Sequence, residues 1–291
     1  MANLKEIRTR ILSVTNTRQV TSAMKMVSAA KLRKAQDAIF KIKPYSEKMQ
    51  QIIETVSGSL EGTLSTPLFT QREIKKTLII LVTSNKGLCG VFNTSITRSA
   101  IEWAKSERAE LFKNNNIEFF TVGRKGYESI IKSEMNSAGR EDNLLHKPSY
   151  DFSAFFIKHL IGEYTEKRFD EIVVFYNSFK NAATQIPTME KLLPISMPEH
   201  SAKEPIEFIL EPNPEVILEE LAPKMLEVRF HKVILDSIAS EHGARMTAMH
   251  KATDNATDLI NDLKLTYNRA RQDSITKEIL EIVSGANALQ G

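Results

Sequence analysis

Two glycine-bearing turns are the places in this chain where residue types and spacing could bind a phosphate. The first, Gly87-Leu88-Cys89-Gly90, follows an apolar run and precedes a helix-forming stretch, as phosphate loops do. It matches neither G-x-G-x-x-G nor a Walker sequence with Gly-Lys-Ser/Thr, so we interpret it as a tight turn. The second, Gly123-Arg124-Lys125-Gly126, adds two basic residues and is a weak anion-site signal. No cofactor is predicted.

The spacing of histidine, cysteine and carboxylate residues predicts neither a metal site nor a catalytic centre. His242 and His250 are eight residues apart, which is not a metal-ligand spacing on a helix, and the single cysteine rules out a thiolate zinc site. Cys89 cannot form an internal disulfide, which suits a reducing compartment. In its glycine turn it is expected to be a small packing residue. No Ser/His/Asp order or carboxylate pair indicates catalysis, so we expect the chain itself not to be an enzyme.

These turns belong to a middle region that lies between two very long predicted helices, residues 3–57 and about 214–288. The apolar residues of the first helix follow one uninterrupted 3-4-3-4 spacing, at Leu4, Ile7, Ile11, Val14, then Leu32, Ala35, Ile39, Ile42, then Met49, Ile53, Val56 and Leu60. This spacing predicts a coiled-coil seam. At about 1.5 Å per residue the first helix would be roughly 80 Å long and the second, counted only from Pro223, roughly 95 Å, too long for a globular domain of this size, so we expect a protruding shaft.

The middle region has the pattern of a small open sheet with crossover helices. Strands are predicted at residues 77–83, 117–122, 171–179, 184–195 and 206–210, and helices at 91–114, 124–133 and 152–167. The expected fold class is α/β: a long antiparallel coiled coil of the N- and C-terminal helices plus a small Rossmann-like domain. We predict three parts, at residues 1–60, 68–210 and 212–291, with a linker at 57–67.

Composition and charge favour pairing of the two long helices with each other. The 291 residues are 42% hydrophobic and 26% charged, with no apolar run long enough to span a membrane and no secretory or transit signal at the start. The net charge of +3 conceals an asymmetry, because residues 1–50 carry eleven Lys/Arg against three Asp/Glu and residues 213–291 carry nine against twelve. Opposite mean charge favours antiparallel pairing and argues against a surface that coats nucleic acid.

The predicted seam is irregular in both helices. In the first helix the spacing puts Arg18, Thr21, Lys25 and Ser28 in core positions, while Val20, Ala23, Met24, Val27 and Ala30 lie to one side. In the second helix the seam is predicted at Met249, Ala252, Ala256, Leu259 and Leu263. After these, Thr266, Ala270, Asp273 and Lys277 continue the spacing, and Ile275, Ile279 and Ile282 form a new apolar stripe. Pairing the irregular stretches puts Asn16 level with Ser274, Met24 level with residues 272–278, and residue 52 level with residue 238. The irregularity indicates either a locally loosened coil or a face that contacts a third partner.

Long stretches at both ends resemble one family of proteins. Residues 4–39 (LKEIRTRILSVTNTRQVTSAMKMVSAAKLRKAQDAI) are similar to the amino-terminal helix of the gamma subunits of F-type ATP synthases. The stretches EHGARMTAM (241–249), ATDNA (252–256), YNRARQDSITKEI (267–279) and EIVSGA (281–286) are similar to the carboxyl-terminal helix of that family. Gly87-Leu88-Cys89-Gly90 with Asn93 matches its first strand-turn-helix. The resemblance spans the whole chain in order.

The resemblance implies a central rotor shaft that couples proton-driven rotation of a membrane c-ring to ATP synthesis or hydrolysis on a ring of alpha and beta subunits. Six positions match those that touch the lever loops of the beta subunits: Met24, Arg245, Arg271, Gln272, Thr276 and Glu278. The implied partners are the alpha, beta and epsilon subunits and the c-ring, and we expect the middle region to contact epsilon and the c-ring. Without a transit peptide, we expect a peripheral subunit on the cytoplasmic face of a bacterial inner membrane.

Two other classes of function remain open from the residues alone. The basic first helix could track phosphates in a coiled-coil nucleic-acid binder, although its charges encircle the helix and no aromatic platform accompanies them. The α/β middle could be a small nucleotide-dependent enzyme carried by a coil. Salt-sensitive DNA binding would favour the first class, and nucleotide turnover by residues 68–210 would favour the second.

Overall fold

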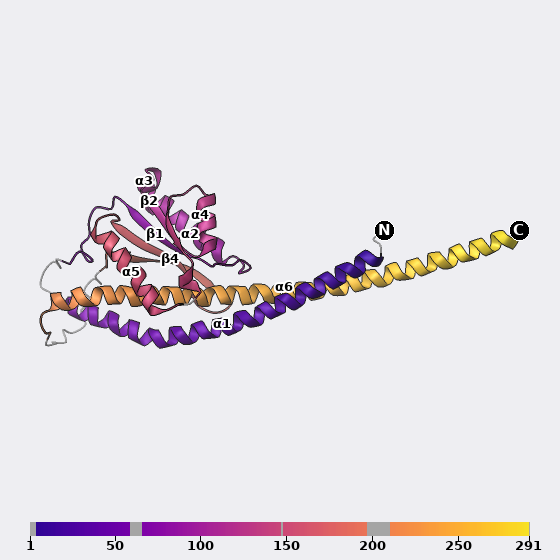
Figure 1. The fold of residues 1–291 in the computed structure, drawn as a ribbon, viewed down its shortest axis with the longest axis horizontal. Coiled ribbons are helices and arrows are strands. Elements are labelled where there is room, and N and C mark those ends of the chain that lie inside the picture. The colour runs from indigo at the N-terminus through magenta and orange to yellow at the C-terminus, as the bar shows by residue number, and fades with distance from the viewer. Residues whose placement is uncertain (1–3, 59–65, 147, 197–209, 291) are drawn as a thin grey trace. The chain divides into compact units, whose positions relative to one another are not determined.

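The structure is a computed structural model that describes residues 4–58, 66–146, 148–196 and 210–290 (Figure 1). These residues form two compact units. Residues up to Ser28 together with residues from Met246 onward form the helical unit, and residues 29–245 form the mixed unit. The predicted three-part division at 1–60, 68–210 and 212–291 stays a prediction about organisation.

Two long helices contribute to both units. Helix α1 spans Leu4–Gly58 with Pro44 inside it, and helix α6 spans Pro214–Gln290 with Pro223 inside it. Both contain the stretches in which 3-4 apolar spacing predicts a helix, so this prediction is confirmed. In the described parts of the chain, no helix combines the length and the apolar character that crossing a membrane requires.

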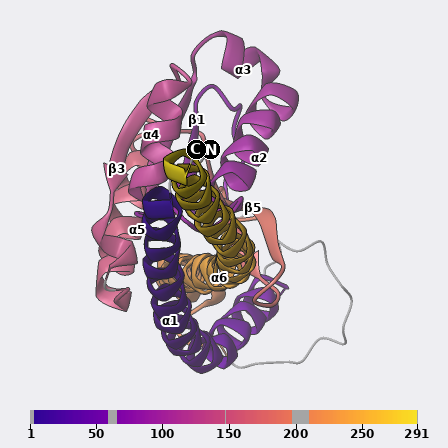
Figure 2. The same ribbon diagram turned by 90° about the vertical axis from the view of Figure 1, so that its right-hand side faces the viewer.

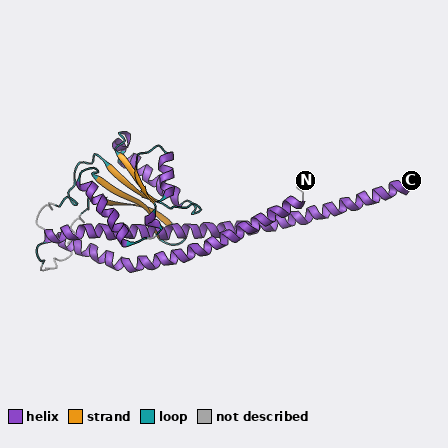
Figure 3. Cartoon of the chain, in the orientation of Figure 1, coloured by secondary structure: helices purple, strands orange, loops and turns teal. Residues whose placement is uncertain are grey.

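The mixed unit contains a five-stranded sheet in the order β3-β2-β1-β4-β5 (Figure 3). Strands β1 (Thr77–Val82), β2 (Ile117–Val122), β3 (Ser137–Glu141) and β4 (Glu171–Phe179) are parallel, and β5 (Gln185–Leu193) pairs antiparallel with β4. β1 is buried at every position, as its continuous apolar run predicts. The expected α/β fold class is confirmed.

Helices cover both faces of the sheet. On one face, α2 (Phe92–Glu107) and α4 (Arg124–Lys132) contribute Ile96, Ala100 and Ile130 to a core with the strands. On the other, α5 (Tyr150–Thr165) and α6 meet the sheet, where the Phe156 ring lies 5.1 Å from those of Phe120 and Phe230. Short helices α3 (Ala109–Lys113) and η1 (Asn143–Leu145) complete the unit, and α3 follows directly after α2 (Figure 2).

The structure corrects the predicted list of strands in one place and leaves another outside its range. The five residues of β3 (SAGRE) have no apolar alternation, and β3 exists because it adds to the open edge of β2. Sequence reasoning missed it for that reason. The strand predicted at 206–210 lies, apart from Leu210, outside the described residues, and Leu210 is not in a strand.

Candidate functional site

Within the helical unit, α1 and α6 run antiparallel, and one hydrogen bond defines their register (Figure 1). The hydroxyl oxygens of Thr21 and Thr253 lie 2.8 Å apart. Counting five residues outward along each helix from this pair puts Asn16 level with Asp258. The prediction that Asn16 lies level with Ser274 is therefore wrong. It matched two irregular stretches to each other, whereas two polar seam residues meet in the structure.

The mixed unit follows the same register. A groove of about 520 Å³ is lined by Ala38, Lys41, Ile42 and Tyr45 of α1, by Tyr150 of α5, and by Val228, His231 and Leu235 of α6. The groove brings residues 38–45 of α1 together with residues 228–235 of α6, as the offset of Thr21 and Thr253 predicts for antiparallel helices. This offset does not bring residue 52 level with residue 238, so that prediction is also wrong.

In the helical unit, the seam on α1 includes polar residues, and the seam on α6 lies one residue away from its predicted position at Leu259. Thr21 and Ser28 are buried although both are polar, as the 3-4 spacing predicted. On α6, Met249 and Ala256 are buried as predicted. The next seam residue is Ile260, which is 4% exposed, and not Leu259, which is 40% exposed. The predicted seam position at Leu259 is therefore wrong, because a choice between two adjacent apolar residues depends on the partner helix.

Apolar side chains lie exposed on both helices of the helical unit. On α1 these are Leu12, Val20, Met26 and Val27, and on α6 they are Leu259, Leu265, Ile275, Ile279, Leu280, Ile282 and Val283. Exposed apolar side chains that gather in one patch are typical of surfaces that contact another molecule. The arrangement supports the interpretation that the irregular seam leaves a face for a third partner.

The six residues predicted to bind a partner do not share one environment. Arg271, Gln272, Thr276 and Glu278 are all exposed on α6, and Met24 is half-buried on α1. Arg245 differs from the other five because it is 7% exposed and belongs to the mixed unit.

The register separates Met24 from the carboxyl-terminal group. It puts Met24 level with His250, so Gln272 lies 22 residues further along α6, or about 33 Å. It also puts residues 272–278 past Leu4, the first described residue of α1. The prediction that Met24 and residues 272–278 lie at one height is therefore wrong.

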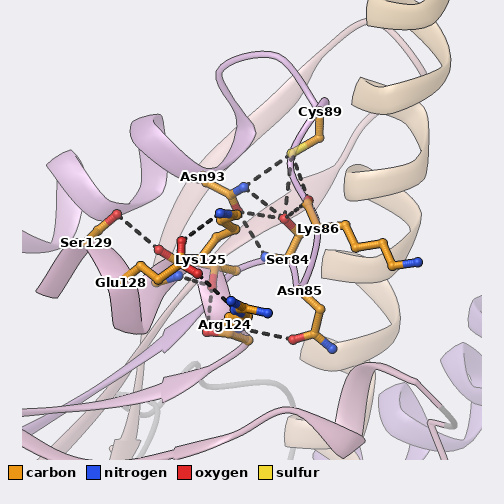
Figure 4. A network of polar contacts seen from close by, with 12 residues as sticks. Ser84, Asn85, Lys86, Cys89, Asn93, Arg124, Lys125, Glu128 and Ser129 are labelled. Carbon is orange, nitrogen blue, oxygen red and sulfur yellow. Dashed lines mark hydrogen bonds and ion pairs between the residues drawn. The ribbon is translucent and has the colours of Figure 1, made fainter. Parts of the chain in front are cut away.

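The carboxyl ends of β1 and β2 carry a connected polar network (Figure 4). The backbone N–H of Ser84 donates to Asn93 Oδ1 at 2.9 Å, and Asn93 Nδ2 lies 2.8 Å from Ser84 Oγ and 3.3 Å from Cys89 Sγ. Ser84 Oγ in turn donates to the carbonyl of Lys86 at 2.7 Å. These contacts hold the turn after β1, residues 84–90, closed upon itself. Cys89 is buried within it, and burial raises the pKa of its thiol.

The start of α4 uses its N–H groups within the protein. The N–H groups of Arg124, Lys125 and Gly126 donate to Asn85 Oδ1, the Ser84 carbonyl and Thr83 Oγ1 at 3.0, 3.0 and 2.8 Å. An anion at this turn would have to displace all three bonds. The basic turn at 123–126 is therefore a packing device, and the weak anion-site signal is not supported.

Close contacts with Thr83 explain why positions 123 and 126 of this second turn are glycines. A Cβ built on Gly126 would lie 2.7 Å from Thr83 Oγ1, and one on Gly123 would lie 2.6 Å from the Thr83 carbonyl oxygen. Gly123 also has φ of +110°. In the first turn Gly90 has φ of +60°, which favours glycine because it has no Cβ.

A segment of α6 fills the edge of the sheet at which open α/β sheets bind ligands, next to the turn after β1. Arg245 Nη2 donates to the carbonyls of Lys86 and Gly87 at 3.0 and 3.3 Å, and its Nε donates to the Gly87 carbonyl at 3.4 Å. Its Nη1 contacts Glu241 Oε1 at 2.6 Å. Nearby, a Cβ on Gly243 would lie 3.2 Å from Ala182 Cα, in the loop after β4.

Burial perturbs the ionisable groups around this contact. Desolvation raises the pKa of Glu241, and the adjacent Arg245 opposes that rise by attracting the carboxylate. Burial also lowers the pKa of His242 to about 4, so this imidazole is neutral near pH 7. Arg245 is thus the positive charge that compensates a buried carboxylate.

Further polar contacts tie α6 to α5 and β5 inside the mixed unit. The Tyr150 hydroxyl donates to Glu227 Oε2 at 2.8 Å, and Ser153 Oγ lies 2.9 Å from His231 Nδ1. Arg229 Nε donates to Glu190 Oε2 at 2.9 Å. Sequence reasoning named none of these pairs, because their members are far apart in the chain and carry no motif. Among the described residues, no group of three or more His, Cys, Asp or Glu side chains could hold a metal ion.

Comparisons with known proteins agree on one family. Residues 3–289 match the family model described as ATP synthase. The ATP synthase gamma chain of Christiangramia forsetii is 47% identical over 291 residues, covering 100% of both chains. That of Cytophaga hutchinsonii is 47% identical over 294 residues, covering 99% of each.

Solved structures resemble the chain in fold. The rotor of the Euglena gracilis mitochondrial ATP synthase in rotational state 1 aligns with a TM-score of 0.66 at 18% identity, covering 94% of this chain and 98% of that one. The central stalk and c-ring structure of the Tetrahymena thermophila mitochondrial enzyme contains a chain that aligns with a TM-score of 0.57 at 22% identity, covering 80% and 99%.

Proposed function

The chain belongs to the ATP synthase gamma-chain family, and from this premise we propose that it is the central rotor shaft of a bacterial F-type ATP synthase. In this role it couples proton-driven rotation of the c-ring to ATP synthesis or hydrolysis on the alpha/beta ring, and it does not carry out the chemistry itself. The observation that carries the proposal is the exposed apolar surface of the helical unit, on both α1 and α6.

A paired-helix rotor is suited to this task for a physical reason. One asymmetric shaft inside a ring of three catalytic sites contacts each site differently at any instant. It can shift their nucleotide affinities only by the difference in contact energy between their conformations. Rotation then passes these differences from site to site. Such a shaft needs a few polar contacts on a surface that otherwise adheres weakly.

Exposed residues of α6 are suited to such polar contacts. Arg271 offers a guanidinium that pairs with carboxylates, and Gln272, Thr276 and Glu278 offer hydrogen bonds that can be exchanged during rotation. All four are exposed, which supports the assignment of contacts with the beta subunits' lever loops. Half-buried Met24 could contact a partner by its exposed part. The buried Arg245 could do so only if the 84–90 turn moved.

We also propose that the mixed unit contacts the epsilon subunit and the c-ring, and that the chain lies peripherally on the cytoplasmic face of the inner membrane. We expect two segments to make these contacts, the 84–90 turn and residues 194–205, and residues 197–205 lie outside the described residues. The bacterial origin of its relatives supports this location.

The two other classes considered from the residues have weaker support. A nucleotide-dependent enzyme would need the carboxyl edge of the sheet, where Arg245 and the α4 start already use the available polar groups. Among the residues that the structure describes, no specific contact favours a nucleic-acid binder.

Copurification and coupling test the rotor proposal. In cells whose only copy of the chain is tagged, we expect the alpha, beta and epsilon subunits and the c-ring to copurify with it. In membrane vesicles, Arg271→Ala combined with Gln272→Ala should lower ATP hydrolysis and proton pumping. Lys264→Ala, an exposed residue on the same helix, is the matched control and should leave both unchanged. A fully active complex that lacks the chain would refute the proposal.

A further inference from the structure

The Arg245 side chain uses its donors inside the mixed unit. Nη1 contacts Glu241 at 2.6 Å, while Nη2 and Nε donate to the two successive carbonyls of Lys86 and Gly87. The residue is 7% exposed. A guanidinium held in this way has no face left for a second molecule, because its planar fork is already paired on both sides.

The bonds of Arg245 go to the backbone of a turn that presents apolar side chains to solvent. Leu88 and Val91 are 63% and 72% exposed, and Leu88 has φ of +63°. The carbonyl of Lys86 also accepts from Ser84 Oγ at 2.7 Å, so Ser84 from within the turn and Arg245 from α6 hold the same group. The conformation that exposes Leu88 therefore depends on a residue more than 150 positions away in the chain.

We propose that Arg245 is a positioning residue, which takes part in coupling by fixing the 84–90 turn and not by touching the catalytic ring. Glu241 anchors the guanidinium, and the guanidinium holds the Lys86 and Gly87 carbonyls. The turn then presents the Leu88 side chain in one orientation. This inference rests on the proposed rotor function for its effect on coupling, but the positioning step itself can be measured on the chain alone.

Limited proteolysis of the full chain measures the positioning step. Trypsin cleaves after Lys86, whose carbonyl Arg245 holds, and cleavage of a transiently opened turn follows the population of the open form. Arg245→Lys keeps the charge opposite Glu241 but loses the fork to both carbonyls. We expect it to speed cleavage at Lys86 about tenfold, the effect of losing one charge-assisted hydrogen bond.

A matched control separates this local effect from general loosening. Arg229→Lys changes an arginine on the same helix whose Nε pairs with Glu190 at 2.9 Å, and it should leave cleavage at Lys86 at the wild-type rate. Equal rates in Arg245→Lys and wild type would overturn the proposal. If Arg245→Lys unfolds and is cleaved at many sites, Glu241→Gln replaces it, since it removes only the anchoring charge. Faster cleavage at Lys86 is expected there as well, and an unchanged rate would again overturn the proposal.

A double-mutant comparison in the assembled complex tests whether Arg245 acts through the turn. Arg245→Lys and Leu88→Asp are made singly and together, and protons pumped per ATP hydrolysed are measured in vesicles. Aspartate is tolerated at positive φ, so Leu88→Asp changes the presented side chain without straining the turn. If each single variant pumps at about one third of wild type, a shared route predicts about one third for the pair and independent routes predict about one ninth.

The outcomes distinguish failure of this inference from failure of the rotor proposal. Pumping by the pair at about one ninth, or normal pumping by Leu88→Asp, would overturn the positioning role while leaving the rotor in place. A chain that does not copurify with the catalytic ring would overturn the rotor proposal, and the proteolysis result would still decide whether Arg245 holds the turn.

Discussion

Removing the positive charge of Arg245 is expected to cost the mixed unit a large part of its stability. The side chains of Arg245 and Glu241 are only 9% and 11% exposed, and their charged atoms lie 2.6 Å apart. Arg245→Met leaves a buried carboxylate without its partner and leaves the carbonyls of Lys86 and Gly87 without a donor. Breaking a buried pair from one side costs about 3–5 kcal/mol. Such a loss is a fifth or more of the typical stability of a domain, about 5–15 kcal/mol.

Urea unfolding followed by fluorescence measures this cost. Trp103 is the only tryptophan and lies in the mixed unit, where its ring packs 5.6 Å from that of Phe175. With a slope of about 2–3 kcal/mol per molar urea, the expected loss lowers the midpoint by about 1–2.5 M. Replacing both partners, as Arg245→Met with Glu241→Leu, should restore most of the midpoint, because an apolar pair leaves no buried charge.

The pH dependence of the unfolding free energy gives a second, independent test of the pairing of Arg245 with Glu241. Burial raises the pKa of Glu241 in the folded state, and Arg245 limits that rise. Without Arg245 the folded pKa rises further. A carboxyl group with a raised folded pKa contributes stability below its unfolded pKa and loses that contribution as pH rises through the folded pKa. The deficit of Arg245→Met should therefore be small near pH 4 and grow towards pH 8. A deficit below about 1 kcal/mol, or one that does not change with pH, would refute the assignment of Arg245 as the compensating charge.

Three further predictions follow from other contacts. Thr21→Cys with Thr253→Cys should form an intrachain disulfide on mild oxidation, seen as a mobility shift on a non-reducing gel, and no crosslink would contradict the observed register. Gly126→Ala should destabilise the mixed unit by about 1–3 kcal/mol in urea unfolding, because the added Cβ would lie 2.7 Å from Thr83 Oγ1. Gly162→Ala is the matched control, because a Cβ there meets open space, and it should stabilise α5 by about 0.5–1 kcal/mol. Burial raises the pKa of Asp236 to about 6, so the stability that this carboxyl group contributes is present below about pH 4 and is lost as pH rises through 6. The free energy of unfolding of Asp236→Asn should therefore increase relative to that of the wild type from pH 4 to pH 7. Parallel profiles of unfolding free energy against pH would exclude this.

Secondary structure was predictable from the sequence where one pattern sufficed. The strand at 117–122 has the predicted bounds, and the two long helices follow from 3-4 spacing along one face. These elements are local, since the period of apolar residues alone distinguishes helix from strand. Strand β3 had no such period, because an edge strand of five residues can be held by backbone pairing with a neighbour.

In the candidate site too, the sequence identified some features and the tertiary structure was needed for others. The stretches that resemble the family pointed to the exposed residues of α6, such as Arg271 and Gln272, as partner contacts. An exposed side chain can contact a partner without any tertiary contact in its own chain. The same stretches also identified Arg245, but not its burial or its bonds to the turn after β1. Those bonds join residues more than 150 positions apart, and only the docking of α6 on the sheet brings them together.

The pairing of two long helices and the α/β region between them could be predicted from the amino-acid sequence, because apolar period and mean charge are properties of each segment alone. The register of the two helices could not, since it depends on contacts between them. A 3-4 seam repeats along the helix, so many alignments bury similar apolar area and the period cannot choose among them. The choice came from pairwise contacts, with Thr21 meeting Thr253 and Ile260 taking the seam in place of Leu259. Such contacts depend on the residues of both helices, so the sequence pattern of one helix alone could not predict them.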